Sequence, residues 1–208
     1  MSGRSSLLSL LLLASCGGEK VPEADPAKVQ ALAKRMVTNV PPPAGARDCT
    51  VGDLHGVPMT AATMLQLAGE PVPTQPEYRD WVNPASLDAP AARVLIDKAA
   101  SETDKRRAAA TLLGAHAFIV YKVEMVNVPL ALELKELKRG AVGMRAIGYE
   151  ANGAVKCILV FTVQNDLAVA NWAMDKTDKA LVDPAIAKAV REDLTKQIEA
   201  RIAGFMAQ

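Results

Sequence analysis

The sequence predicts an α+β domain in which an antiparallel β-meander of three or more strands packs against flanking helices. Alternating apolar and polar residues indicate strands near 116–126 and 154–164. An Asn-Gly pair just before the second of these indicates a hairpin whose first strand lies near 140–150. Helical periodicity, strongest near 26–40 and 184–202, places amphipathic helices on both sides of the strands. Strands that are grouped together, with helices outside them, are typical of this fold class.

Two helices are expected in the first 70 residues. Asp25 is a good N-cap for the first, and Pro26 suits its first position, where a missing N–H costs nothing. A run of three prolines ends this helix. Pro58 is expected to open the second helix, which ends near Ala68 with Gly69 as its C-terminal glycine.

A long loop is predicted at 70–89, where four prolines interrupt any periodicity. Loops of this length inside a compact domain are often functional. Tyr78 and Trp81 lie within it. We expect both aromatic side chains to hold the loop on the core, with a ligand contact as the alternative.

Two more helices are predicted after this loop. Ser86 or Asp88 is expected to cap the first of them, which carries a Val-Leu-Ile run. Ser101 and Asp104 form a capping pair for the second, and Gly114 ends it. Both therefore have recognisable start or stop signals.

The strand region contains two further signals. One face of 116–126 is apolar throughout, whereas the other face turns charged at Lys122 and Glu124, so half of that second face should be exposed. Asn152 and Gly153 are predicted as the two central residues of a type I′ turn, because both positions need a positive φ.

The remaining segments are expected to be helical. Residues 129–139 fit either a helix or a strand, and their good helix formers and Gly140 favour a short helix. Asn165 or Asp166 is expected to cap a helix after the meander. Pro184 opens the long final helix, whose apolar residues follow a single stripe.

Composition limits the possible functions of the chain. Its net charge is +1, which argues against a nucleic-acid partner. Only 4% of the residues are aromatic, so platforms for base stacking and aromatic clefts for carbohydrate are not expected. The sequence contains no zinc-protease motif, no serine-hydrolase elbow and no phosphate-binding glycine loop, so no cofactor is implied.

The N-terminus carries a signal for export. Arg4 precedes an apolar run at 7–13, which is far shorter than the roughly 20 residues that span a bilayer, so it indicates a signal peptide. The run ends in the tetrapeptide Leu-Ala-Ser-Cys, with Cys16 last. This tetrapeptide resembles the lipobox of bacterial lipoproteins, in which a signal peptidase cuts before the cysteine and the cysteine then carries lipid.

The resemblance implies three parts: a signal peptide at 1–15, a lipidated tether at 16–24 and a single globular domain at 25–208. Lipid on Cys16 would be the only attached group and would hold the protein on a membrane of the cell envelope. In lipoproteins of cells with two membranes, Asp after the cysteine favours the inner membrane. Gly17 at this position therefore favours the outer membrane, facing the periplasm.

Export also bears on the two remaining cysteines. Cys49 and Cys157 would meet an oxidising compartment, where leftover cysteines commonly pair, so we predict a disulfide between them. It would close a loop of about 107 residues, worth about 4–5 kcal/mol in the chain-entropy model. Cys157 lies on an apolar strand face, which leaves two unpaired thiols as the alternative.

One motif suggests metal chemistry. Gly-Asp-Leu-His-Gly at 52–56 resembles the opening signature of the calcineurin-like metallophosphatases, which implies Asp53 and His55 as metal ligands. That family's later motifs are absent, and the only other histidine is His116. A turn in which Asp53 caps the backbone is therefore the favoured interpretation.

Together these observations predict a membrane-anchored lipoprotein whose domain is a non-catalytic binding or interaction module. Two alternatives remain open. The first is a small periplasmic hydrolase or metal-dependent enzyme that uses Asp53, His55 and perhaps His116. The second is a carrier of lipid or small apolar ligands, with a pocket beneath the sheet.

Overall fold

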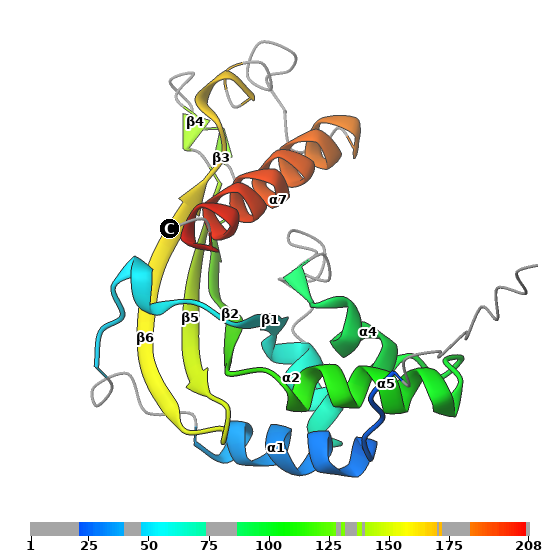
Figure 1. Cartoon of the computed structure of the whole chain (residues 1–208). Coiled ribbons are helices and arrows are strands. Elements are labelled where there is room, and N and C mark those ends of the chain that lie inside the picture. The colour runs from blue at the N-terminus through cyan, green and yellow to red at the C-terminus, as the bar shows by residue number, and fades with distance from the viewer. Residues whose placement is uncertain are drawn as a thin grey trace, which may run out of the picture.

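The structure is a computed structural model (Figure 1), and it describes residues 21–39, 47–73, 87–127, 130–131, 137–138, 140–169, 171 and 184–206. The elements in chain order are α1 (Pro26–Thr38), the 3₁₀ turn η1 (Val51–Asp53), β1 (Val57–Thr60), α2 (Ala61–Ala68), α4 (Pro90–Ile96), α5 (Glu102–Leu113), β2 (Ala117–Asn127), β3 (Leu130–Ala131), β4 (Leu137–Lys138), β5 (Ala141–Glu150), β6 (Val155–Gln164) and α7 (Pro184–Met206). Helices combined with a sheet confirm the predicted α+β class.

The main sheet has four strands in the order β1-β2-β5-β6. Strands β2, β5 and β6 pair antiparallel, as the sequence predicts. Strand β1, however, pairs parallel with β2, and Val57 lies opposite Phe118. The sheet is therefore mixed, and the expectation of a purely antiparallel meander is wrong. The fourth strand is only four residues long, so no alternation marks it in the sequence.

The same strand changes the start of the second helix. Pro58 lies in β1 rather than at the first position of a helix, and α2 begins only at Ala61. Thr60 is the true N-cap, because its hydroxyl accepts a hydrogen bond from the Thr63 N–H at 3.1 Å. An edge strand tolerates Pro58 because a proline has no N–H to leave unpaired. Gly69 ends the helix with a φ of 77°, as expected for its C-terminal glycine.

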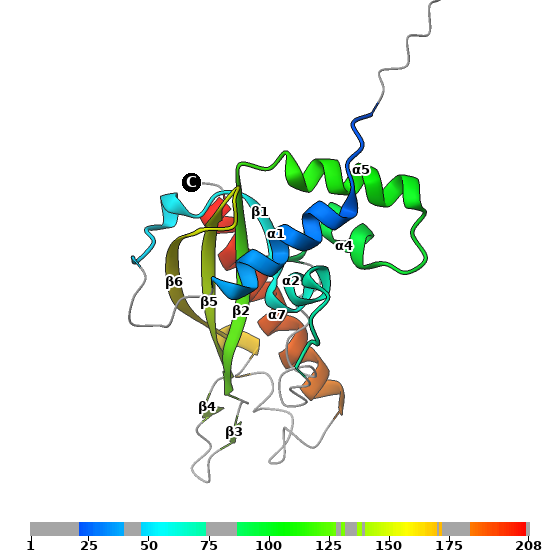
Figure 2. The same ribbon diagram turned by 90° about the horizontal axis from the view of Figure 1, so that it is seen from below.

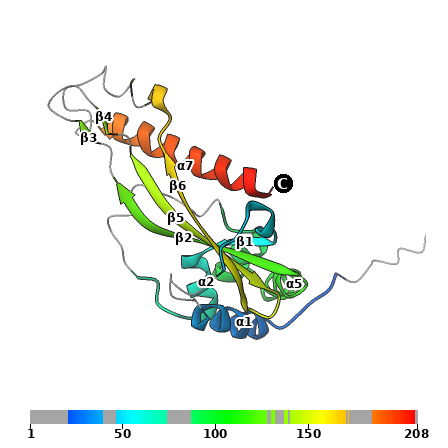
Figure 3. The same ribbon diagram turned by 90° about the vertical axis from the view of Figure 1, so that its left-hand side faces the viewer.

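Helices cover the two faces of the sheet differently. Alternate residues of β2 enter two separate apolar clusters, which lie on opposite faces. One cluster joins the sheet to α1, α2, α4 and α5, which gather at one end (Figures 1 and 2). The other joins the sheet to α7, which crosses it apart from the other helices (Figure 3). The predicted exposed half-face exists: Lys122 and Glu124 are exposed, and Val160 on β6 is 69% exposed.

Helix α1 begins as predicted and supports the tip of the β5–β6 hairpin. The carboxylate of Asp25 accepts a hydrogen bond from the Ala27 N–H at 2.9 Å. The hairpin turn itself differs from the expected type I′ geometry. Its hydrogen bond runs from the Gly153 N–H to the Glu150 carbonyl, so the central residues lie one position earlier than predicted. Gly153 has a φ of 85°, which fits the glycine that follows the turn in a three-residue hairpin loop.

Of the N-caps predicted for the next two helices, one is confirmed and one is wrong. Ser101 accepts a hydrogen bond from the Asp104 N–H, which confirms the predicted start of α5. Helix α4 has Ala89 as its N-cap, without any side-chain hydrogen bond. Asp88 therefore does not cap α4, and Ser86 lies outside the described residues. The Asp88 carboxylate instead binds the start of α2, because it lies next to β1 in the fold.

The later segments also differ from the prediction at one place. The short helix expected at 129–139 is wrong at both ends, because β3 and β4 form a small antiparallel pair there. Residues 132–136 lie outside the described part of the chain. Asp166 accepts a hydrogen bond from the Ala168 N–H, as a cap at this position should. The apolar stripe of α7 is confirmed by the burial of Val190, Leu194, Ile198 and Ile202.

Candidate functional site

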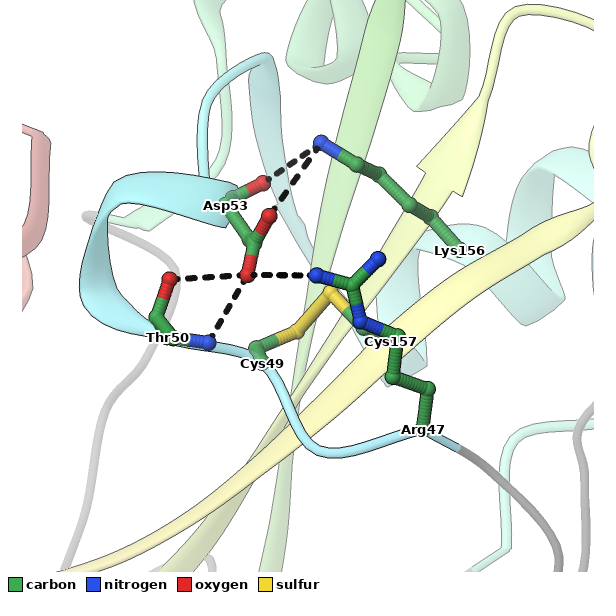
Figure 4. The surroundings of a disulfide bond; sticks show 6 residues. All are labelled: Arg47, Cys49, Thr50, Asp53, Lys156 and Cys157. Carbon is green, nitrogen blue, oxygen red and sulfur yellow. Dashed lines mark hydrogen bonds and ion pairs between the residues drawn. A yellow bond between two sulfur atoms is a disulfide. The ribbon is translucent and has the colours of Figure 1, made fainter.

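The best-defined cluster of polar groups surrounds a disulfide at the β6 edge of the sheet (Figure 4). Cys49 and Cys157 form this bond, which confirms the predicted pairing. Both residues are buried, with exposed fractions of 6% and 1%. The bond therefore belongs to the core and attaches the segment 47–56 to the outer strand.

Backbone hydrogen bonds attach the same segment. The Cys49 N–H donates to the Ile158 carbonyl at 2.8 Å, and the Ile158 N–H donates to the Arg47 carbonyl at 2.9 Å. Asp48 and Ile158 form a parallel β-bridge. Residues 47–49 thus behave as a very short fifth strand, which the disulfide holds in place.

Asp53 organises the turn that follows. Its Oδ2 accepts hydrogen bonds from the Thr50 N–H at 2.9 Å and the Thr50 hydroxyl at 2.8 Å. Arg47 and Lys156 approach the same carboxylate at 3.6 and 3.9 Å. The hydrogen bonds from Thr50 are the main reason why the pKa of Asp53 is below its ordinary value of 3.8, and the two cations lower it further.

This geometry bears on the proposed metal ligands. Asp53 points towards two cations and a turn that it caps, which is the favoured interpretation of the motif. His55 and His116 are both exposed and precede β1 and β2, which lie away from the β6 edge. Among the described residues, no three His, Cys, Asp or Glu side chains approach closely enough to hold a metal ion.

Sequence reasoning missed several residues of this cluster. Arg47, Thr50 and Lys156 come from segments about a hundred residues apart, and only the fold brings them together. Their signal was indirect: once Cys49 pairs with Cys157, their chain neighbours must also meet. Cys16, Tyr78 and Trp81 lie outside the described residues, so their predicted roles stay predictions.

A second polar cluster is buried at the opposite edge of the sheet. Asp88 is only 5% exposed, and its carboxylate accepts hydrogen bonds from the Thr60 N–H at 2.6 Å and the Thr63 hydroxyl at 2.7 Å. The Thr60 hydroxyl donates, at 3.4 Å, to the same carboxylate oxygen, Oδ2, that accepts from Thr63. The arrangement joins β1, α2 and the start of α4.

Two hollows of about 440 and 400 Å³ open on the surface. Glu23, Glu102 and Arg106 are among the residues that line the first, near the start of α1. Glu192 and Lys196 on α7 border the second. Charged groups at both rims make these hollows unlike the enclosed apolar cavity of a lipid carrier.

Comparison with known proteins adds no assignment. No protein-family model matches the chain, and no curated protein or solved structure shows significant similarity to it. None of the helices within the described ranges combines the length and apolar character that crossing a bilayer requires.

Proposed function

We propose that this protein is a membrane-anchored bacterial lipoprotein whose domain is a non-catalytic binding or interaction module. The observation that carries the proposal is the Leu-Ala-Ser-Cys tetrapeptide that ends at Cys16, after a short apolar run. Cys16 would carry covalent lipid and no other cofactor is proposed. In a cell with two membranes, Gly17 favours the outer membrane facing the periplasm.

The disulfide supports export. Disulfides persist in oxidising compartments and are rare in the reducing cytosol. The bond between Cys49 and Cys157 is buried and joins residues with a sequence separation of 108, so it serves the fold rather than a transient redox reaction. A location in the cell envelope would provide the oxidising conditions in which this disulfide persists.

The start of the domain supports a short tether. The Ala24 N–H donates to the Arg106 carbonyl at 3.0 Å, so the chain joins α5 before α1 begins. Residues 17–23 can reach about 25 Å when fully extended. The α1 and α5 end of the domain would therefore lie close to the membrane surface.

The internal bonding of Asp53 supports a non-catalytic role. A catalytic or metal-binding carboxylate must present free oxygen atoms to its ligand. Here Oδ2 accepts two hydrogen bonds from Thr50, and the guanidinium of Arg47 lies 3.6 Å from it. These contacts stabilise the turn instead of leaving a reactive group exposed.

Metabolic labelling with a radioactive fatty acid tests the anchor. The full chain should take up label and sediment with membranes, whereas Cys16→Ala should lose both properties. The matched control is the double variant Cys49→Ala and Cys157→Ala, which should keep the label. Label that survives Cys16→Ala, or a wild-type chain without label, would contradict the proposal.

One observation favours a second candidate, a carrier of small apolar ligands. The buried hydroxyl of Tyr121 has no hydrogen-bond partner among the described residues, and it lies on the sheet face that α7 covers. A buried unpaired hydroxyl is costly, and a ligand oxygen at this position would satisfy it. Mass spectrometry of solvent extracts from the purified full chain tests this. A carrier should release a bound compound that Tyr121→Phe loses, and an empty extract would argue against it.

A further inference from the structure

The outer edge of β6 changes character beyond Ile158. The N–H and carbonyl of Ile158 point away from β5, because both bind the 47–49 segment. Backbone groups alternate in direction along a strand, and no bulge interrupts the β5–β6 register from Ile158 to Gln164. The N–H and carbonyl groups of Val160, Thr162 and Gln164 must therefore also point outward.

These outward groups lie past the end of the covering segment. The attached segment reaches only Ile158, and no described residue pairs with the backbone of Val160, Thr162 or Gln164 on that side. The side chains of the same three residues are exposed on the open half-face. Backbone and side chains together present a strip that is ready to accept another strand.

The strip also lacks the usual protection of an edge strand. Natural edges carry lysines, prolines, glycine bulges or inward-pointing charges that prevent pairing with other chains. Residues 158–164 contain no charged residue, no proline and no glycine. Val160, an apolar residue of this strip, is 69% exposed. An edge of this kind pairs readily with a compatible strand.

We propose that two copies of this protein associate by antiparallel pairing of their β6 edges across a two-fold axis. The outward residues Val160, Thr162 and Gln164 must face outward residues of the partner, and Ile158 is already occupied. Only one register pairs all three, with Val160 opposite Gln164 and Thr162 opposite itself. Thr162 therefore lies on the two-fold axis.

A second copy fits this strip because it supplies the required complement. The added strand needs alternate unpaired backbone groups and uncharged side chains, and β6 itself has both. A symmetric pair is the commonest oligomer of soluble proteins. The chain's net charge of +1 gives little electrostatic repulsion between copies.

The contact is small, so free monomers would associate weakly. Confinement to a membrane surface raises the effective concentration and would strengthen the association. In this respect the inference rests on the proposed lipoprotein function, although the pairing itself does not require the anchor.

Thiol cross-linking of the full chain tests the dimer. Thr162→Cys places a thiol beside its symmetry mate, and a short bismaleimide should then produce a covalent dimer. Thr111→Cys on α5 is the matched control, because Thr111 is an exposed threonine far from this edge. Adding Val160→Lys to the Thr162→Cys variant should abolish the dimer, since it places a charge within the strip.

Each outcome decides one proposal. Thr162→Cys should give a several-fold stronger dimer band than Thr111→Cys. Equal bands, a band that survives Val160→Lys, or a product with the mass of a different protein would overturn the dimer. Cross-linking of the wild-type chain would show that Cys16 has a free thiol, and would contradict the lipid anchor alone. An unchanged unfolding transition of the Val160→Lys variant shows that the domain remains folded.

Discussion

The two edges of the main sheet are closed by different means, and only one is closed completely by the residues that the structure describes. Strand β1 is four residues long, contains Pro58 and receives the Ala89 N–H on the Pro58 carbonyl at 2.9 Å. The Thr60 N–H is satisfied by the carboxylate of Asp88. Strand β6 is ten residues long, and the cover that described residues give it ends at Ile158. Asp88 and Ala89 close the first edge, whereas the 47–49 segment and a disulfide close part of the second.

The comparison indicates where stability and interaction are located. Closing an edge requires that each outward N–H and carbonyl find a partner, because unpaired backbone groups attract other chains. The β1 edge meets this condition with a proline and a buried carboxylate. The β6 edge meets it only where Cys49 is bonded to Cys157. We therefore expect the loss of a polar partner at the β1 edge to lower the stability of the domain. We expect the β6 edge to provide the surface that contacts a second copy.

Removal of the disulfide should have the largest effect. The double variant Cys49→Ser and Cys157→Ser frees the 47–49 segment from β6 and opens that edge further. Because the cysteines have a sequence separation of 108, we expect a loss of about 4–5 kcal/mol in the free energy of unfolding. Urea denaturation measures it. A loss below about 1 kcal/mol would mean that the backbone bonds of Ile158 hold the segment without the disulfide.

Removal of the carboxylate at the other edge should come next. Asp88→Ala leaves the Thr60 N–H and the Thr63 hydroxyl without their buried acceptor. We expect a loss of about 3 kcal/mol in the free energy of unfolding, because each unsatisfied buried donor costs about 1–3 kcal/mol. Asp97→Ala is the control, since Asp97 caps the Ala99 N–H at an exposed site. Equal losses in the two variants would show that burial of Asp88 does not matter.

Two buried tyrosines show the same contrast in single side chains, since the hydroxyl of one is hydrogen-bonded to a described residue and that of the other is not. The Tyr149 hydroxyl donates to the Met36 carbonyl at 3.2 Å, whereas no group in the described part of the chain pairs with the Tyr121 hydroxyl. Burial raises the pKa of both to about 12, so both are neutral near neutral pH. Tyr149→Phe should lower the free energy of unfolding by about 1 kcal/mol, and Tyr121→Phe should leave it unchanged or raise it. Thermal denaturation of the two variants in parallel shows which of them is less stable.

The smallest effect concerns the turn beside the disulfide. Hydrogen bonds from Thr50 lower the pKa of Asp53 in the folded state, so the carboxylate stabilises the turn above pH 3.8. This contribution should disappear as the pH falls through the lowered folded-state pKa. Asp53→Asn should therefore show a weaker loss of thermal stability on acidification than the wild type. Parallel acid titrations of the unfolding temperature would reveal identical slopes if Asp53 had no role.

The sequence predicts those parts of the fold that depend on local pattern. The β2, β5 and β6 strands alternate, and α1, α5 and α7 have caps or stripes that are visible in the chain. The disulfide followed from the compartment that the lipobox implies. The strand and helix signals each lie within a short stretch of sequence, and the disulfide followed from the oxidising compartment alone. None of them required knowledge of tertiary contacts.

Other features depend on contacts between distant residues. Strand β1 exists because it pairs with β2, and Pro58 alone resembles a helix start. Asp88 appeared to be a cap for its own helix, but the fold places it beside Thr60. The cations around Asp53 were equally hidden, since Lys156 is 103 residues away. The open edge of β6 became visible only when the bonds of Ile158 fixed the direction of its backbone.

Residue-resolved amide hydrogen exchange of the full chain tests the central contrast most directly. At low protein concentration, the amide of Ile158 should be protected by its bond to Arg47, whereas those of Val160 and Thr162 should exchange like exposed backbone. The amides of Val160 and Thr162 should gain protection as the protein concentration rises and β6 edges pair. Amides of Val160 and Thr162 that are as protected as that of Ile158 at every concentration would contradict an open β6 edge.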